Sequence, residues 1–118
     1  MITTKRAYEP ANDSDGYRVL IDRLWPRGLS KARADLDAWE KDIAPSEELR
    51  KWYNHKPSKW KEFKSRYLRE LRSTAARAVL DDLVRRARRG RVTLVYASHS
   101  DLSNANVLEK KLARRLAK

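Results

Sequence analysis

Short apolar runs and longer helical stripes divide the chain into recognisable elements. The segment 17–22 reads YRVLID, and its three consecutive apolar residues are typical of a strand that is covered on both faces. The segment 92–97, VTLVYA, has the same character, and the segment 2–8, ITTKRAY, is rich in β-branched residues. The hydrophobic pattern therefore predicts three strands.

Helical periodicity fills most of the chain between the second and third predicted strands. Apolar residues recur at +3 and +4 spacing in the segments 60–71 and 76–87, and Gly90 ends the second of these stripes. A third stripe, 107–116, closes the chain. These three segments are predicted to be the main helices.

Local signals mark further helix starts. Ser30, Ser46 and Ser73 are residues of the type that caps a helix N-terminus. Leu36, Trp39 and Ile43 also fall at +3 and +4 spacing, which predicts a short helical turn in that region.

The lengths of the connections predict how the strands are arranged. The loop 9–16 is short for a crossover between adjacent parallel strands, which needs about a dozen residues or more. The first two strands are therefore either antiparallel or not adjacent. About 70 residues separate the strands at 17–22 and 92–97, which predicts that these two are parallel. We expect an α/β fold in a single small domain, residues 1–118, with a short mixed or parallel three-stranded sheet flanked by helices.

Charged and aromatic residues follow the second strand. Parallel strands end at the same edge of a sheet, and in open α/β sheets ligands bind at that edge. Asp22 and Arg23 end the strand, and Trp25 and Arg27 lie in the turn that follows. Arg27 precedes a predicted helix start, where backbone N–H groups also favour anions.

Several of these side chains have more than one possible role. Asp22 either pairs with a nearby arginine to stabilise the loop, or orients Arg23 or Arg27 toward an anion, or acts as a general base. Trp25 either stacks on a nucleobase or fills the bottom of the loop. Asn104, at the start of the last helix, is either an N-cap or a ligand contact.

Charge adds a second hypothesis. The 118 residues include 28 Lys+Arg against 16 Asp+Glu, a net charge of +12, and residues 61–118 hold 16 of the basic and 6 of the acidic ones. A surface this basic attracts polyanions through counterion release, which makes nucleic acid a candidate partner. The candidate contacts are Arg85, Arg86, Arg88, Arg89, Lys110, Lys111 and Arg114.

Basic side chains in such numbers also occur in proteins that bind no nucleic acid. Lys and Arg in the last turn of a helix complement the helix dipole, and a solvated basic surface needs no ligand. A chain that is rich in arginine and lacks glutamine and cysteine is also typical of heat-adapted proteins.

Composition excludes several classes of protein. The absence of cysteine excludes disulfides and thiolate chemistry, and with two histidines we expect no metal site. Both glycine-rich nucleotide signatures are missing, so no cofactor is indicated. No apolar run approaches about 18 residues, and the N-terminus has no apolar signal core, so we expect a cytoplasmic protein without a membrane span. The oligomeric state is open.

Three long segments resemble the YeaO-like family, which is also known as domain of unknown function 488. They are DGYRVLIDRLWPRGLSK, KDIAPSEELRKWYNHKPSKWKEFKSRYLREL and VTLVYASHSDLSNANVL, and the resemblance spans about residues 5 to 112. The resemblance implies a compact α/β fold with a shared polar site, and it supplies no substrate because the biochemical function of the family is not established.

The family pattern falls on residues in all three segments. The positions are Asp22, Arg23, Trp25, Pro26, Arg27, Gly28, Lys41, Pro45, Ser46, Leu49, Arg50, Trp52, His55, Trp60, Phe63, Tyr67, Tyr96 and Asn104. Many relatives have His-Asp-Pro where this chain has His55-Lys56-Pro57, so a carboxylate partner for His55 is missing. This departure weakens an acid/base mechanism at His55.

Two functional hypotheses follow. The first is a pocket at the carboxyl ends of the strands at 17–22 and 92–97 that binds a small anionic or nucleotide-like ligand. Its candidate residues are Asp22, Arg23, Trp25, Arg27, Arg50 and Asn104, and Asp22 and His55 are the catalytic candidates if the protein is an enzyme. The alternative is a nucleic-acid-binding protein that uses the basic helices of residues 61–118.

Overall fold

Four parallel strands form the sheet in the computed structural model, which describes residues 1–118. The strands are β1 (Ile2–Arg6), β2 (Tyr17–Leu20), β3 (Ala38–Trp39) and β4 (Val92–Tyr96), and their order in the sheet is β1-β4-β2-β3. β4 is therefore central although it is the last strand in the chain. Ile2 and Tyr17 both align with Val92, so β1 and β2 begin level with β4 on either side of it.

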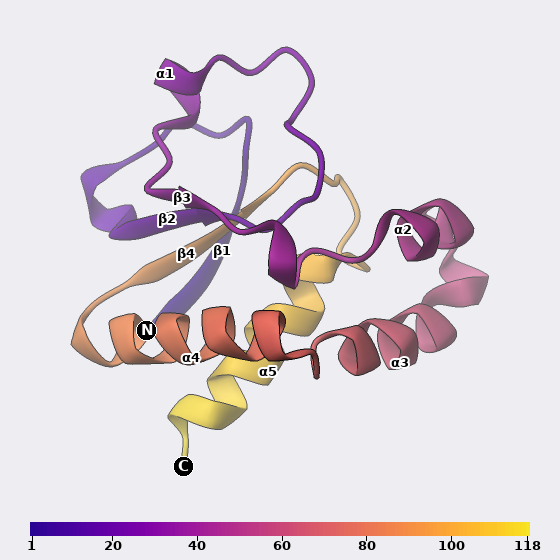
Figure 1. Ribbon diagram of the computed structural model, residues 1–118. Coiled ribbons are helices and arrows are strands. Elements are labelled where there is room, and N and C mark those ends of the chain that lie inside the picture. The colour runs from indigo at the N-terminus through magenta and orange to yellow at the C-terminus, as the bar shows by residue number, and fades with distance from the viewer.

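Five α-helices and three 3₁₀ turns complete the chain. The helices are α1 (Lys31–Ala34), α2 (Glu47–Tyr53), α3 (Trp60–Glu70), α4 (Thr74–Arg89) and α5 (Asn104–Leu116), and the turns are η1 (Asp13–Asp15), η2 (Lys41–Ile43) and η3 (Pro57–Lys59). Figure 1 shows α1 on one side of the sheet and α4 and α5 crossing on the other, with α2 and α3 extending beyond the ends of the strands. None of the helices is both long and apolar enough to cross a membrane.

Each face of the sheet has its own hydrophobic core. Val19 and Ile21 of the second strand segment pack with α4 and α5 in a cluster of 19 buried residues. Leu20 points to the opposite face and packs with Ala34 and Val95 in a cluster of five. The run of three apolar residues is thus covered on both faces, as predicted, because successive side chains of a strand alternate between the faces.

The α/β fold class is confirmed, and two details of the predicted sheet are resolved. β2 and β4 are parallel, and β1 is not adjacent to β2 because β4 lies between them. The sheet is entirely parallel, and it has a fourth strand that the apolar pattern did not predict.

The fourth strand, β3, lies in the first part of the segment where a helical turn was predicted, and a short helical turn, η2, forms only at Lys41–Ile43. Ala38 and Trp39 pair with Val19 and Leu20, and the residues that share +3 and +4 spacing do not share a face. Trp39 and Leu36 pack against the small cluster, whereas Ile43 belongs to the large cluster on the other side of the sheet. Tertiary packing therefore overrides the local helical spacing.

The three predicted serine caps are confirmed. The hydroxyl groups of Ser30, Ser46 and Ser73 accept hydrogen bonds from backbone N–H groups at the starts of α1, α2 and α4, each over 3.1 Å. A serine cap stabilises a helix because it satisfies an N–H group that has no partner within the helix.

A buried ion pair supports the amino ends of the strands. Arg18 is only 3% exposed, and its guanidinium donates to the carboxylate of Asp15 over 2.7 Å and to the carbonyl of Ala34 over 2.8 Å. Lys5 donates to the same carboxylate from β1. These contacts connect β1 and β2 with the end of α1.

Gly16 should be the glycine that tolerates substitution least. Its φ of +68° and ψ of −132° suit glycine alone, and a Cβ there would lie 2.2 Å from the carbonyl oxygen of Arg91. We expect Gly16→Ala to lower the free energy of unfolding by about 2–5 kcal/mol, from backbone strain and overpacking together, as measured by urea denaturation.

Gly28→Ala is the matched control. Gly28 also has a positive φ, +77°, but a Cβ there would meet no atom within 4 Å, so we expect a cost of only about 1–2 kcal/mol. Equal costs at the two positions would contradict the close approach of Gly16 to Arg91.

Candidate functional site

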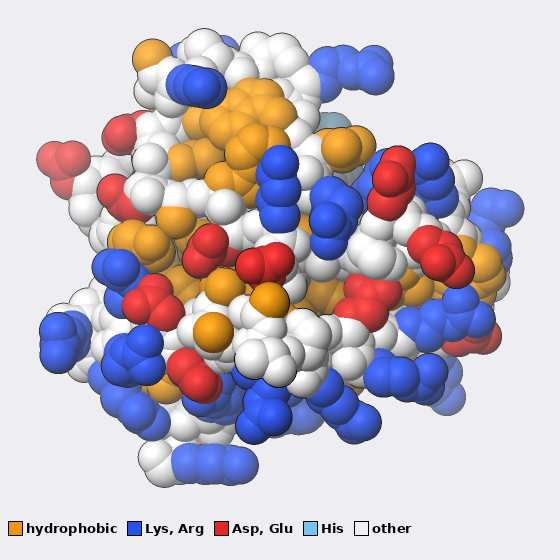
Figure 2. Space-filling model, viewed as in Figure 1, with side chains coloured by type: hydrophobic (Ala, Val, Ile, Leu, Met, Phe, Trp, Pro, Cys, Tyr) orange, Lys and Arg blue, Asp and Glu red, His pale blue; other side chains and the backbone are white.

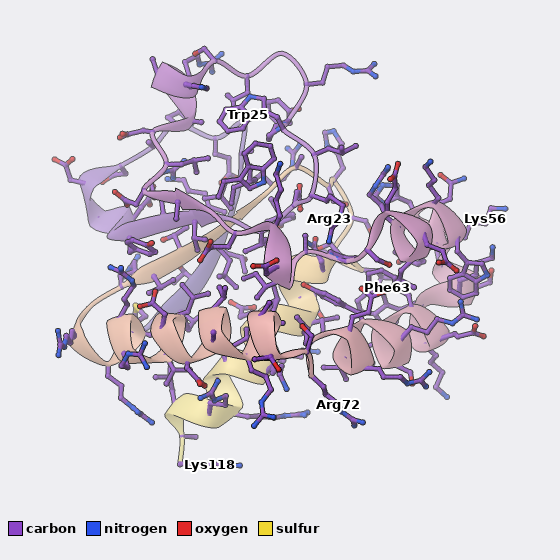
Figure 3. The ribbon with its side chains drawn as sticks, viewed as in Figure 1. Arg23, Trp25, Lys56, Phe63, Arg72 and Lys118 are labelled. Carbon is purple, nitrogen blue, oxygen red and sulfur yellow. The ribbon has the colours of Figure 1, made fainter.

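A cavity of about 460 Å³ opens at the carboxyl ends of β2 and β4. The loop after β2 forms one wall, the loop after β4 forms a second, and α2 with part of α3 forms the third. Figure 3 shows Arg23 between the sheet and α2, and Phe63 on α3. The lining residues are Asp22, Arg23, Leu24, Trp25, Pro45, Arg50, Tyr53, His55, Phe63, Ala97, Ser98, His99, Ser100, Ser103 and Asn104.

The structure brings together most of the residues that the sequence pattern singled out. Five of the six predicted ligand-binding residues line the cavity, and His55 joins them: Asp22, Arg23, Trp25, Arg50, Asn104 and His55. Arg27 does not line the cavity. Its side chain is exposed, and its carbonyl accepts a hydrogen bond from the hydroxyl of Tyr8 on the outside of the loop.

The carboxylate of Asp22 connects three segments of the chain. One oxygen accepts the backbone N–H of Ala97 over 2.9 Å, and the other accepts the side-chain amide of Asn104 over 3.1 Å. The same amide donates to the carbonyl of Ile21 over 3.0 Å. The N-cap of α5 is Ser103 and not Asn104. The side chain of Asn104 instead joins the start of α5 to the end of the β2 segment.

Asp22 forms no ion pair, so it neither pairs with an arginine nor orients one. Burial raises the pKa of Asp22, and the hydrogen bonds from Ala97 and Asn104, with the charge of His55, offset only part of this effect. The carboxylate is thus a half-buried acceptor without a cation in contact with it.

Arg23 is held at the cavity by the backbone before α2. Its Nε donates to the carbonyl of Pro45 over 3.0 Å, and its Nη2 lies 3.4 Å from the carbonyl of Lys41. These bonds use one side of the guanidinium fork, and Nη1 has no protein partner. The side chain is therefore positioned while it keeps the ability to donate to an anion.

Arg50 and His55 come from α2 and the turn that follows it. Arg50 is exposed on α2, and its side chain makes no hydrogen bond within the protein. Asn54 and His55 have left-handed φ values of 43° and 54°, and this turn places the His55 ring 6.2 Å from the ring of Tyr53. Consecutive left-handed residues other than glycine are uncommon, and such strain clusters at functional sites.

Trp25 closes its own loop. Its indole N–H donates to the carbonyl of Leu29 over 2.6 Å, and its ring packs edge-on against Trp39 at 5.4 Å between centroids. Trp39 in turn donates to the carbonyl of Asp22 over 2.7 Å. Figure 2 shows an apolar patch on the surface where Figure 3 labels Trp25, so the ring fills the loop and stays half-exposed.

Nine of the 15 lining residues were not among the predicted site residues, and Tyr53, Phe63 and His99 are three of these nine. Tyr53 and Phe63 are 5% and 3% exposed and stack on each other at 4.2 Å between centroids, which makes them the apolar floor. Phe63 lies in the predicted apolar stripe 60–71, and such a stripe does not distinguish a core from a cavity wall. Tyr53 lies outside the predicted stripes. His99 lies in the loop after β4, with Nε2 3.3 Å from a guanidinium nitrogen of Arg6. Its position after a strand that ends at the ligand-binding edge was the available signal.

Comparison with known proteins identifies the family. Residues 1–118 match the family model described as the inactive DUF488-N3 subclade. The chain belongs to the DUF488 family. It is 44% identical to the uncharacterized protein Rv3073c of Mycobacterium tuberculosis over 97% of this chain and 95% of that protein. It is 41% identical to the uncharacterized protein YeaO of Escherichia coli over 87% of this chain and 88% of that protein. No solved structure matches the chain.

None of the Lys and Arg side chains in residues 61–118 of this DUF488 chain lines the cavity. Figure 2 shows Lys and Arg side chains over α3 and α4 and along the C-terminal end of α5. Arg85 and Arg86 share the carboxylate of Asp82, and Arg86 also lies 4.0 Å above the ring of Tyr17. The remaining predicted contacts form no ion pair: Arg88, Arg89, Lys110, Lys111 and Arg114.

Replacing Asp22 with asparagine should destabilise the fold although the two side chains have the same shape. The carboxylate accepts two N–H groups, whereas the asparagine amide has one acceptor oxygen. Either orientation of the amide leaves two donors facing each other, so we expect Asp22→Asn to cost about 1–3 kcal/mol of unfolding free energy at neutral pH. Urea denaturation measures this cost.

The cost of Asp22→Asn should grow as the pH falls. Because burial raises the pKa of Asp22, the folded state binds this proton more readily than the unfolded chain, and the wild type gains stability as the pH falls toward the ordinary value of 3.8. Asp42→Asn is the control, because Asp42 is exposed and outside the cavity. The same cost for both substitutions would contradict the bridging role of Asp22.

Proposed function

We propose that the cavity binds a small anionic ligand and that the protein acts by binding rather than by catalysis. The observation that carries this proposal is the convergence of Arg23, Arg50, His55 and His99 around one cavity at the carboxyl edge of a parallel sheet. The volume of about 460 Å³ falls within the range of roughly 300–1,000 Å³ that is usual for small-molecule pockets.

Charge supports an anion. The cavity wall has two arginines and two histidines but a single carboxylate, Asp22, whose pKa is raised by burial. A guanidinium that is already oriented, like that of Arg23, loses little side-chain entropy when it binds an anion. Rigid placement of this kind favours specific recognition over diffuse attraction.

The geometry gives little support to catalysis. No hydrogen bond joins Asp22 to His55, and Lys56 follows His55 where a carboxylate would orient a histidine base. Both oxygens of Asp22 are engaged by Ala97 and Asn104. The description of the matching subclade as inactive agrees with a binding role.

Removing the free guanidinium should weaken anion binding without unfolding the protein. Arg50 makes no side-chain hydrogen bond within the protein, so Arg50→Gln removes charge and leaves the fold intact. We expect the affinity for inorganic phosphate or sulfate to fall about 10-fold or more, since a hydrogen bond to a charged group contributes roughly 1.5–3 kcal/mol. Isothermal titration calorimetry at low salt measures this change.

Arg27→Gln is the matched control for Arg50→Gln. Arg27 has the same charge and belongs to the loop that forms one wall, but it lies outside the cavity. Its substitution should leave the affinity unchanged. Equal losses for Arg27→Gln and Arg50→Gln would show that the overall charge attracts the anion, and no binding by the wild type would reject the proposal.

A second candidate function is nucleic-acid binding through α4 and α5. The observation in its favour is that Arg88 and Arg89, at the end of α4, are exposed and form no ion pair. Lys110 and Arg114 on α5 are likewise exposed and unpaired. Cations without carboxylate partners are available to neutralise phosphates.

Salt dependence tests this second candidate. For a labelled oligonucleotide, the Arg88→Gln/Arg89→Gln variant should bind more weakly, and the slope of log K against log salt should become shallower by about 0.9 for each lost phosphate contact. Lys31→Gln/Arg33→Gln removes the same charge from α1, on the other side of the sheet, and should leave the slope unchanged. Absence of binding by the wild type at low salt would exclude the nucleic-acid hypothesis.

A further inference from the structure

We infer that the ligand of the cavity is a nucleoside monophosphate, and this inference rests on the proposed anion-binding function. The phosphate would lie at Arg23 and Arg50, the ribose hydroxyls at Asp22, and the nucleobase against Tyr53 and Phe63. Three features of the cavity carry the inference. They are a carboxylate in its wall, an aromatic floor, and the difference in exposure between the buried aromatic side chains and the exposed Arg50.

The carboxylate requires a hydrogen-bond donor on the ligand. Asp22 lines the cavity, and a bare anion beside it would be repelled. Its two oxygens each accept one N–H, from Ala97 and Asn104, and a carboxylate has about four acceptor sites, so it retains capacity for further donors. Neutral hydroxyl groups satisfy such a site, and an acidic residue that accepts ribose hydroxyls is a recurrent arrangement beside parallel sheets. The cavity thus favours a ligand with hydroxyl groups at one end and an anion at the other.

The aromatic floor favours a planar ring. Tyr53 and Phe63 stack on each other at 4.2 Å between centroids, and the hydroxyl of Tyr53 donates to the carbonyl of Leu102 over 2.8 Å. That bond uses the polar end of Tyr53, and the small exposed part of each ring lines the cavity. An apolar aromatic wall contributes little to the binding of a bare sugar phosphate, whereas a nucleobase gains stacking and burial there.

Helix α2 carries both the residue proposed to bind the phosphate and one proposed to contact the nucleobase. Arg50 and Tyr53 are three residues apart on α2, so they lie on the same face of the helix. Arg50 is exposed, whereas Tyr53 is 5% exposed. An anion at the mouth and a ring at the floor match this gradient, because a charged phosphate keeps part of its hydration and the ring loses all of its contact with water.

Four ligands test the inference on the wild-type protein. They are inorganic phosphate, ribose 5-phosphate, adenosine monophosphate and 2′,3′-dideoxyadenosine monophosphate, each titrated by calorimetry at one salt concentration. We expect adenosine monophosphate to bind about 10-fold or more tightly than ribose 5-phosphate, the range that stacking of one nucleobase provides. The dideoxy analogue should bind about 5- to 10-fold more weakly than adenosine monophosphate, since it lacks the hydroxyls that Asp22 would accept.

One substitution locates the nucleobase. Phe63→Leu should bring the affinity for adenosine monophosphate close to that for ribose 5-phosphate while the affinity for ribose 5-phosphate stays constant. Trp60→Leu is the control, because Trp60 packs on Phe63 at 5.7 Å but does not line the cavity, so it should leave the ratio of the two affinities unchanged. Thermal unfolding of each variant confirms that it is folded at the temperature of the titration.

The outcomes separate this inference from the proposed function. Binding of inorganic phosphate with no gain for adenosine monophosphate would overturn the inference and leave the anion site in place. Equal affinities for adenosine monophosphate and its dideoxy analogue would overturn the role of Asp22 in it. Failure of all four ligands to bind would overturn both the inference and the proposed function.

Discussion

One half-buried carboxylate connects the sheet, the last helix and the cavity. Asp22 follows β2, and its oxygens accept N–H groups from Ala97, just after β4, and from Asn104, at the start of α5. Asn104 also bonds the carbonyl of Ile21, so the turn after β2 cannot move relative to α5 without leaving buried polar groups unpaired. The walls of the cavity are therefore positioned by contacts that also complete the fold.

The arrangement of the sheet followed from the sequence because connection length limits topology. A short loop after β1 excluded an adjacent parallel β2, and the long helical segment after β2 required β4 to be parallel to it. These two constraints agree with the observed order, in which β4 separates β1 from β2. The same argument placed Asp22 and Asn104 at one edge of the sheet, and the structure shows them in contact.

Other features depend on contacts that no local pattern encodes. The strand β3 has two residues, and its pairing with Val19 and Leu20 is decided by tertiary packing. Arg23 and Arg27 look equivalent in the sequence, but Arg23 is bound to the backbone before α2 whereas Arg27 faces outward. Phe63 lies in an apolar helical stripe, and periodicity shows which face of a helix is apolar without showing whether a core or a cavity lies against it.

Two aspartates at opposite ends of β2 show how the same residue type takes different roles. For Asp15, burial works against ionisation, but hydrogen bonds from Asn12, Lys5 and Arg18 outweigh it, and the pKa of Asp15 is lowered. For Asp22, burial raises the pKa and no cation is in contact with the carboxylate. A carboxylate that is paired with cations within the protein has little left to offer a ligand, so Asp15 stabilises the amino edge of the sheet.

Asp22 keeps acceptor capacity in a cavity wall because the protein supplies donors without supplying a counter-charge. An acidic group without a cationic partner at the carboxyl edge of the sheet is costly for stability, and perturbed groups of this kind cluster at functional sites in proteins generally. The stabilising ion pair and the unneutralised carboxylate thus lie at opposite edges of one sheet, and the carboxylate at the carboxyl edge both connects β2, β4 and α5 and keeps acceptor capacity toward the cavity.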